Sequence, residues 1–234
     1  MKVEIRNLFR APYGVPNGLQ MTDDGLWIAD QVTDRCSLMN VEETDDYYGV
    51  AKQVREIPSE SSNTSGLTHA DGLLWFAANG AGGRWRTARD TDAPTGEALG
   101  VDPGTGETKR REKIPDGGGT HGIEHDKFEP ETLWLTTLKS QTATQVKISD
   151  WSIKRTVNLP LKRAHGMVRV EDGLWVTHTG DRVIVKLDIE TSEEMDRIKI
   201  PEPHPEPHGL SAYKDGSWVY CDATSGWVAE IVLS

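Results

Sequence analysis

The sequence predicts an all-β fold, a five-bladed β-propeller that spans residues 1–234 as a single domain. The main observation is an internal repeat: a glycine, a short apolar run, a turn and a Trp-bearing strand recur five times. The 23 Gly, 12 Pro and 8 Trp residues favour many turns and short aromatic strands over long helices. The N-terminal segment also has the pattern of the one strand that the last copy lacks. The copies begin at Asn17, Ser65, His121, His165 and His208, a period of about forty to sixty residues that is typical of propeller blades.

Each copy opens with a hairpin. In four copies the turn contains an Asp-Gly pair, which is favoured chemistry for a two-residue β-turn. The pairs are Asp24-Gly25, Asp71-Gly72, Asp172-Gly173 and Asp215-Gly216. The second strand of each hairpin carries the Trp that anchors the repeat. These residues are Trp27, Trp75, Trp134, Trp175 and Trp218.

A third and a fourth strand complete each copy. Val183, Val185 and Leu187 alternate with polar residues, as expected for a half-buried third strand. The fourth strand ends at an aliphatic residue followed by proline, which lacks the N–H donor that would continue a ladder. These ends are Ile57-Pro58, Ile114-Pro115, Leu159-Pro160 and Ile200-Pro201.

The last copy has only three strands and finishes with GWVAEIVLS. The segment KVEIRNLFR near the N-terminus supplies the missing fourth strand. We therefore expect the N-terminal strand to complete the last blade and remove an open sheet edge.

Composition excludes several classes of partner. A net charge of −11 argues against nucleic acid, whose phosphates require clustered Lys and Arg. No apolar run approaches the ~20 residues of a membrane helix, so no membrane partner is expected. The start, MKVEIRNLFR, has no apolar signal segment, which predicts a cytoplasmic protein. Oligomeric state is left open.

The residue before each repeat glycine is the key functional position. Inner strands of a propeller run side by side around a channel, so equivalent positions converge near the axis. Three of the five are histidines, namely His121, His165 and His208. Neutral imidazole binds Zn, Fe or Mn and is a poor ligand for calcium. Three such ligands and an open position are typical of a catalytic metal. The alternative is a hydrogen-bonded polar plug in the channel.

Other residues join this candidate site by position. If Asp172-Gly173 forms a two-residue turn, His178 lies opposite Met167, near His165, where it can act as a general acid or base. Asn17 and Ser65 occupy the two remaining axial positions, and Asp30 and Asp222 end their Trp strands at the same mouth. The second copy carries an insertion, NGAGGRWRTARDTDAPTGEALG, which is either a mobile surface loop or a lid. If the insertion is a lid, Arg84 can pair with an anionic substrate.

The run HGMVRVEDGLWVTHTGDRVIVKLDIETSEEMDRIKIP resembles a blade of the gluconolactonase/senescence-marker-protein and streptogramin B (virginiamycin B) lyase superfamily. PNGLQMTDDGLWIAD is similar to the PNG blade of that superfamily. The resemblance implies a divalent metal on the channel axis, held by residues directly before the blade glycine. Asn17 matches the PNG asparagine, and His165 stands where lactonases carry an aspartate. Histidines in place of oxygen ligands favour a softer metal than calcium, and most members have six or seven blades.

The sequence therefore predicts a metal-dependent enzyme acting on a small organic molecule at the propeller axis, either a lyase or a hydrolase of an ester or lactone. Elimination is slightly favoured. Two alternatives remain: a non-catalytic binding or scaffold propeller, and a redox enzyme with histidine-ligated iron. The predicted cofactor is a divalent transition metal, Zn, Fe or Mn.

Overall fold

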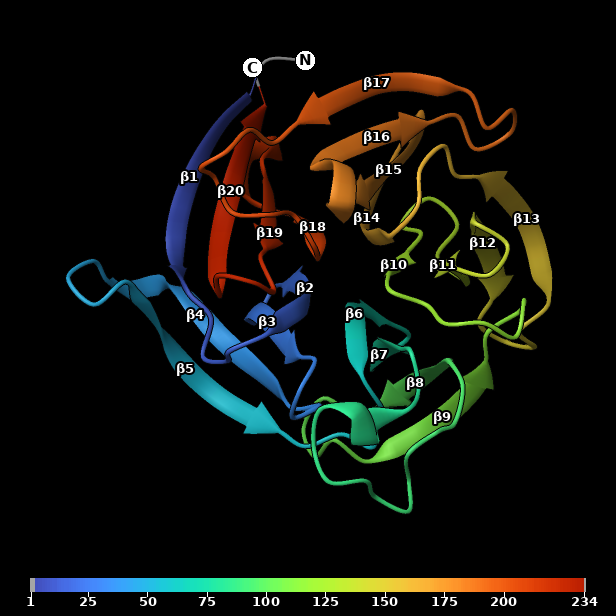
Figure 1. Ribbon diagram of the computed structural model, residues 1–234, viewed down its shortest axis with the longest axis horizontal. Helices are drawn as coiled ribbons and strands as arrows, with labels where there is room; N and C mark the ends of the chain where they lie inside the picture. The colour runs from blue at the N-terminus through green and yellow to red at the C-terminus, as the bar shows by residue number, and fades with distance from the viewer. Residues whose placement is uncertain (1–2, 234) are drawn as a thin grey trace.

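Twenty strands lie in a ring around a central axis in the computed structural model of the chain, which describes residues 3–233 (Figure 1). The fold is all-β, and helical structure in this range is limited to three short 3₁₀ turns. None of the helical segments in residues 3–233 is long and apolar enough to cross a membrane.

Hydrogen bonding groups these strands into four sheets. Three sheets have four antiparallel strands each, which follow chain order from the axis outward (Figure 1). The first holds β6 (Thr64–Ala70), β7 (Leu73–Ala78), β8 (Glu97–Val101) and β9 (Thr108–Lys113). The second holds β10 (Ile123–His125), β11 (Thr132–Thr137), β12 (Thr142–Lys147) and β13 (Ile153–Asn158). The third holds β14 (Ala164–Val170), β15 (Gly173–His178), β16 (Val183–Leu187) and β17 (Glu194–Lys199).

The fourth sheet has eight strands and contains both ends of the chain. One half holds β18 (Leu210–Ala212), β19 (Trp218–Cys221), β20 (Trp227–Leu233) and β1 (Val3–Arg10). The other half holds β5 (Val50–Ile57), β4 (Cys36–Asp45), β3 (Gly25–Asp30) and β2 (Pro16–Thr22). A single parallel bridge, Arg10 to Val50, joins the two halves. The sequence predicted five separate sheets, whereas the hydrogen bonding gives four, one of which is twice the size of the others.

The N-terminal strand closes the ring as the sequence predicted. β1 runs antiparallel to β20, from the pair Val3–Leu233 to the pair Arg10–Trp227. Phe9 of β1 is fully buried in a core cluster with Leu19 of β2 and Val228 of β20. The first strand thus belongs to the core of the last repeat.

The repeat glycines mark places where neighbouring inner strands nearly touch. One occurs in each repeat: Gly18, Gly66, Gly122, Gly166 and Gly209. A Cβ on Gly66 would lie 2.7 Å from the carbonyl oxygen of His121, and a Cβ on Gly18 would lie 2.7 Å from the carbonyl carbon of Gly66. Gly122 abuts the carbonyl oxygen of His165 in the same way. Only glycine permits this approach of backbone to backbone.

The hairpin turns differ from the expected Asp-Gly register. Asp71-Gly72 is a two-residue turn with both φ angles positive, as a type I′ turn requires. In the first and fourth repeats the strands instead pair at Thr22–Gly25 and Val170–Gly173, so each glycine is the first residue of a strand. In the last repeat the connection is longer than two residues.

Close packing explains why glycine follows Asp at the two shifted positions. A Cβ on Gly25 would lie 2.5 Å from the carbonyl oxygen of Met39, and a Cβ on Gly173 would lie 2.7 Å from that of Leu187. Both oxygens belong to residues of the third strand of the same repeat. The glycines are therefore needed for strand packing and not for the turn itself.

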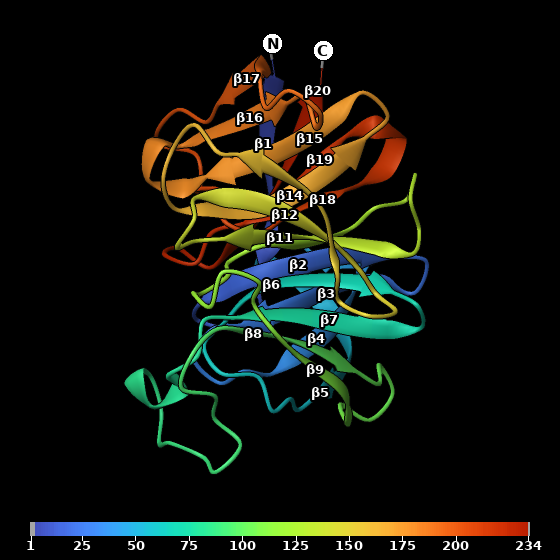
Figure 2. The same cartoon turned by 90° about the vertical axis from the view of Figure 1, so that its right-hand side faces the viewer.

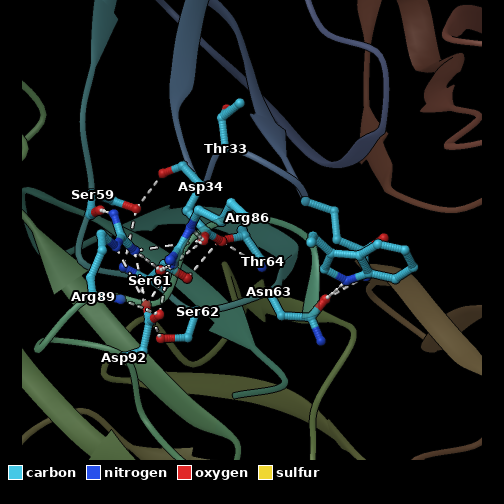
Figure 3. A network of polar contacts seen from close by, with 12 residues as sticks. Thr33, Asp34, Ser59, Ser61, Ser62, Asn63, Thr64, Arg86, Arg89 and Asp92 are labelled. Carbon is cyan, nitrogen blue, oxygen red and sulfur yellow. Dashed lines mark hydrogen bonds and ion pairs between the residues drawn. The ribbon is translucent and has the colours of Figure 1, made fainter. Parts of the chain in front are cut away.

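The insertion of the second repeat lies at the edge of the ring and does not extend across its centre (Figure 1), and it projects from one face (Figure 2). Its Arg86 fastens it to the ring (Figure 3). The Arg86 guanidinium donates to Asp34 Oδ2 at 2.9 and 2.7 Å and to Asp92 at 2.6 and 2.8 Å. Asp34 is 1 % exposed and also accepts from the backbone and hydroxyl of Thr64. The insertion is therefore a loop that Arg86 anchors to the ring.

We expect Phe9→Ala to lower the free energy of unfolding by about 3–5 kcal/mol, because it deletes a buried aromatic ring and leaves a cavity where β1 meets β20. Chemical denaturation followed by circular dichroism measures the loss. The matched control is Phe128→Ala, since the Phe128 side chain is 44 % exposed. Equal effects of the two substitutions would mean that β1 is not part of the core.

Candidate metal and active site at the ring axis

The three repeat histidines meet at the axis. The ring centroids of His121 and His165 lie 4.2 Å apart, and those of His165 and His208 lie 5.0 Å apart. His165 and His208 are 2 % and 5 % exposed, and His121 is partly buried. Three consecutive repeats deliver these rings, because the glycine after each histidine lets the adjacent backbones come together. We call this group the axial histidine cluster.

The cluster has nitrogen atoms without hydrogen-bond partners. They are Nδ1 of His121 and both ring nitrogens of His165, judged against the described residues 3–233. Burial, with a smaller contribution from the positive charge of Arg163, lowers the pKa of His121 to about 4. Burial likewise holds the pKa of His165 well below its usual range. Both rings are neutral at pH 7, and neutral imidazole is the metal-binding form.

Two carboxylates flank His208. Glu206 Oε2 lies 4.0 Å from His208 Nε2, and Asp222 Oδ1 lies 3.9 Å from His208 Nδ1. Within residues 3–233 this is the one set of three or more His, Cys, Asp or Glu residues whose ligand atoms all lie within 4.8 Å of one another, so the three axial histidines do not form such a set by themselves. His208 therefore belongs to two donor sets, one of imidazoles and one with carboxylates. The sequence analysis missed Glu206, although its place two residues before His208 was a usable signal.

Asn17 and Ser65 complete the axial layer. Asn17 Nδ2 lies 3.5 Å from Ser65 Oγ, and Asn17 Oδ1 is buried without a partner in the described part of the chain. Ser65 Oγ also accepts from Asn79 Nδ2 at 2.8 Å. Asn79 fixes Ser65, while Asn17 keeps a free acceptor at the axis.

Asp30 and Asp222 hold their own loops. Asp30 accepts from the backbone N–H groups of Val15 and Thr33 at 3.1 and 2.8 Å. Asp222 accepts from the backbone N–H groups of Glu206 and Thr224 at 3.0 and 2.7 Å. Both carboxylates are nearly fully buried. Asp222 therefore also positions Glu206 beside His208.

His178 lies in a different register from the one expected. It pairs with Ala164, whereas Met167 pairs with Val176. Two causes combine: the turn begins one residue earlier than Asp172-Gly173, and a bulge follows Ala164. The His178 ring is fully buried; its Nδ1 lies 3.3 Å from the carbonyl oxygen of Lys162, and its Nε2 has no partner within residues 3–233. Burial lowers its pKa, so the ring is neutral at pH 7.

Arg84 stays at the edge of the ring with the insertion. It is exposed, and its guanidinium lies 4.6 Å from the centroid of the Trp85 ring. The structure does not bring it to the axial histidine cluster.

Glu124 is a second residue that the sequence analysis missed. It follows Gly122 by two positions on the inner strand β10, and its Oε1 accepts from the backbone N–H of Arg169 at 3.3 Å. Burial raises the pKa of its carboxyl to about 8. Glu124 is therefore mostly protonated at pH 7, and its hydrogen bond to Arg169 links β10 to β14.

No protein-family model matches the sequence, and no curated protein sequence matches it either. Solved structures do match. A glutaminyl cyclase from Myxococcus xanthus aligns with 99 % of this chain and 96 % of its own, with a TM-score of 0.74 and 10 % identity. A streptogramin B lyase aligns with 99 % of this chain and 98 % of its own, with a TM-score of 0.57 and 14 % identity.

Virginiamycin B lyase from Staphylococcus aureus gives a TM-score of 0.53 at 19 % identity, over 98 % of this chain and 74 % of that protein. The same lyase also matches as a catalytically inactive histidine-to-alanine variant with quinupristin, at 18 % identity. Identities this low establish the fold alone. The chain is a streptogramin lyase-like β-propeller in its architecture.

We expect Glu124→Gln to stabilise the protein increasingly as pH rises from about 4.5 to 8. The folded-state pKa of this carboxyl is raised, so its favourable contribution is complete below the unfolded-state pKa and is lost as pH rises through about 8. The neutral amide has no such loss, and the difference should reach roughly 2 kcal/mol for a partly exposed group. Urea denaturation at several pH values measures it. The exposed Glu171→Gln variant should show no such trend. If the free energy of unfolding of Glu124→Gln relative to wild type does not change with pH, the raised pKa of Glu124 is contradicted.

Proposed function

We propose that this chain is an enzyme with a divalent transition metal at the axial histidine cluster, and that it acts on a small organic substrate by elimination or hydrolysis. We favour elimination. The proposal treats the eight-stranded sheet as two blades, which makes a five-bladed propeller with one axial residue from each blade. The observation that carries it is the close approach of three imidazole rings, two of them nearly fully buried, with centroids 4.2 and 5.0 Å apart.

The side chains fit a metal. Unpartnered buried nitrogens are costly unless a ligand satisfies them, and His121 and His165 together present three. Imidazole suits Zn, Fe and Mn, so these are the candidate ions. Glu206 adds an oxygen donor next to His208, which favours Mn more than a purely nitrogen site would. Asp222 contributes less, because its oxygens already accept from the loop.

A bound metal would act as a Lewis acid toward a carbonyl or carboxylate oxygen of the substrate. The protein must then supply a base that is neutral at working pH and has a free nitrogen. His178 meets both conditions and is our first candidate for proton transfer. His208 is the second, because Glu206 and Asp222 can stabilise the protonated ring. Asn17 and Ser65, which share the axial layer, are the proposed substrate contacts.

The comparisons support a lyase of this kind. Streptogramin B lyase and virginiamycin B lyase have the same architecture, and a histidine-to-alanine change inactivates the latter. We take from them only the reaction class and the use of histidine on this scaffold.

Metal content tests the proposal. We expect close to one equivalent of Zn, Fe or Mn per chain in the purified protein, measured by mass spectrometry of the elements. His121→Gln and His165→Gln should each lose most of it, because each removes one nitrogen ligand. His204→Gln is the control, since His204 lies in the loop before β18 and outside the cluster. A protein without metal after reconstitution with all three ions would overturn the proposal.

Products distinguish the two reactions. Against a panel of lactones, esters and carboxylates with a β leaving group, we expect the metal-loaded protein to release products whose summed mass equals that of the substrate. Hydrolysis would add the mass of one water, and mass spectrometry separates the two cases. His178→Gln should lower kcat by about 100-fold or more if it is the base. If only His208→Gln has that effect, the proton-transfer role belongs to His208.

A further inference from the structure

A cavity of about 330 Å³ opens beside the axial histidine cluster, between the sheet of β10–β13 and that of β14–β17. His121 forms part of its wall, so the cavity reaches the proposed metal site. The segment that connects β13 to β14 contributes four of the ten lining residues, and the loop after β11 contributes three more. Its apolar wall consists of leucines: Leu138, Leu159 and Leu161.

Three cations surround the same cavity: Lys139, Lys162 and Arg163. None of them forms an ion pair with a carboxylate within residues 3–233. On the neighbouring strand β13, by contrast, Arg155 pairs with Glu129 at 3.0 Å. The chain as a whole carries a net charge of −11. Three unpaired positive charges around one cavity are therefore a local reversal of the protein's charge.

Arg163 links this cavity to the axis. It stands two residues before His165, and its backbone adopts the left-handed region with φ of 50°, which is uncommon and costly for a non-glycine residue. The Arg163 side chain passes beside Gly180, where a Cβ would make an ordinary van der Waals contact of 3.7 Å with Arg163 Cδ. The guanidinium is also near enough to His121 and His165 for its charge to help keep both rings neutral.

We propose that this cavity binds the charged head of the substrate, and that the substrate is a small organic oxyanion with an apolar body. Arg163 and Lys162 pair with the carboxylate or phosphate, and Lys139 adds charge at the opening. The leucine wall holds the apolar part, and His121 places the reacting end next to the metal. The assignment rests on the proposed function for that last step, although anion binding itself does not require it.

Calorimetric titration tests the cavity directly. The probes are phenylacetate, phenyl phosphate and the neutral phenylacetamide, with inorganic phosphate as the head group alone. We expect at least one organic anion to bind about tenfold or more tightly than the amide, because charge-assisted pairs with Arg or Lys are stronger than neutral hydrogen bonds. Preference between the two anions identifies the head group. Equal binding of phenyl phosphate and inorganic phosphate, or of anion and amide, would overturn the proposal.

The variants locate the site. Arg163→Gln should weaken anion binding by about tenfold or more, and Lys162→Gln should weaken it by a smaller factor. Lys147→Gln is the control, because Lys147 is an exposed cation on β12 outside the cavity. All three positions are exposed, so the variants should keep the wild-type melting temperature. Unchanged affinity in Arg163→Gln would overturn the assignment.

Repeating the titration on chelator-treated protein separates this inference from the proposed function. Anion binding that survives metal removal supports the cavity. If anion binding is lost with the metal, the anion binds to the metal itself. That result would overturn the assignment of the cavity as the anion site, but it would not contradict the proposed function. A protein that never holds metal but binds the anion overturns the proposed function and leaves the anion site standing.

Discussion

The close contact of five inner backbones at glycine is the constraint on which the rest of the structure depends. Four of the five repeat glycines pack against the neighbouring strand at a distance under 3.0 Å that excludes any side chain, and a Cβ on Gly209 would meet its neighbours at a tight 3.0 Å. Hydrogen bonds cross the same seam, as from Gly166 N to the carbonyl oxygen of His208 at 2.9 Å. The residue before each glycine is thereby brought to the axis. The function of the chain then depends on which residue occupies that position.

Burial gives these axial residues their chemical character. Desolvation disfavours charge, so it keeps the histidines neutral and Glu124 protonated, while Arg163 remains charged at the edge of the same region. Neutral imidazoles thus lie at the axis, and the cations Lys139, Lys162 and Arg163 line the cavity that His121 borders. Such a set of groups suits proton transfer next to an anionic substrate better than a purely structural channel would require.

The sequence was sufficient to predict the repeat, the closing β1–β20 pair and the convergence of three histidines, because all three follow from periodicity. It placed His178 wrongly, since a one-residue shift of the turn and a bulge change the register without altering the pattern. Glu206, Glu124 and Arg163 were missed for other reasons. For Glu206 the signal, its place two residues before His208, was overlooked. The importance of Glu124 and Arg163 depends on neighbours from other repeats, and spacing along a single chain does not reveal those neighbours.

The pairing of β1 with β20 has a consequence for biosynthesis. Val3 is synthesised long before its partner Leu233, because nearly the whole propeller lies between them in the sequence. Until β20 has been made, β1 lacks its antiparallel partner. The nascent chain then exposes an unpaired strand edge of the kind that promotes aggregation. Contacts between such remote positions also slow folding. The ring can therefore close only once the segment that contains Leu233 has been synthesised.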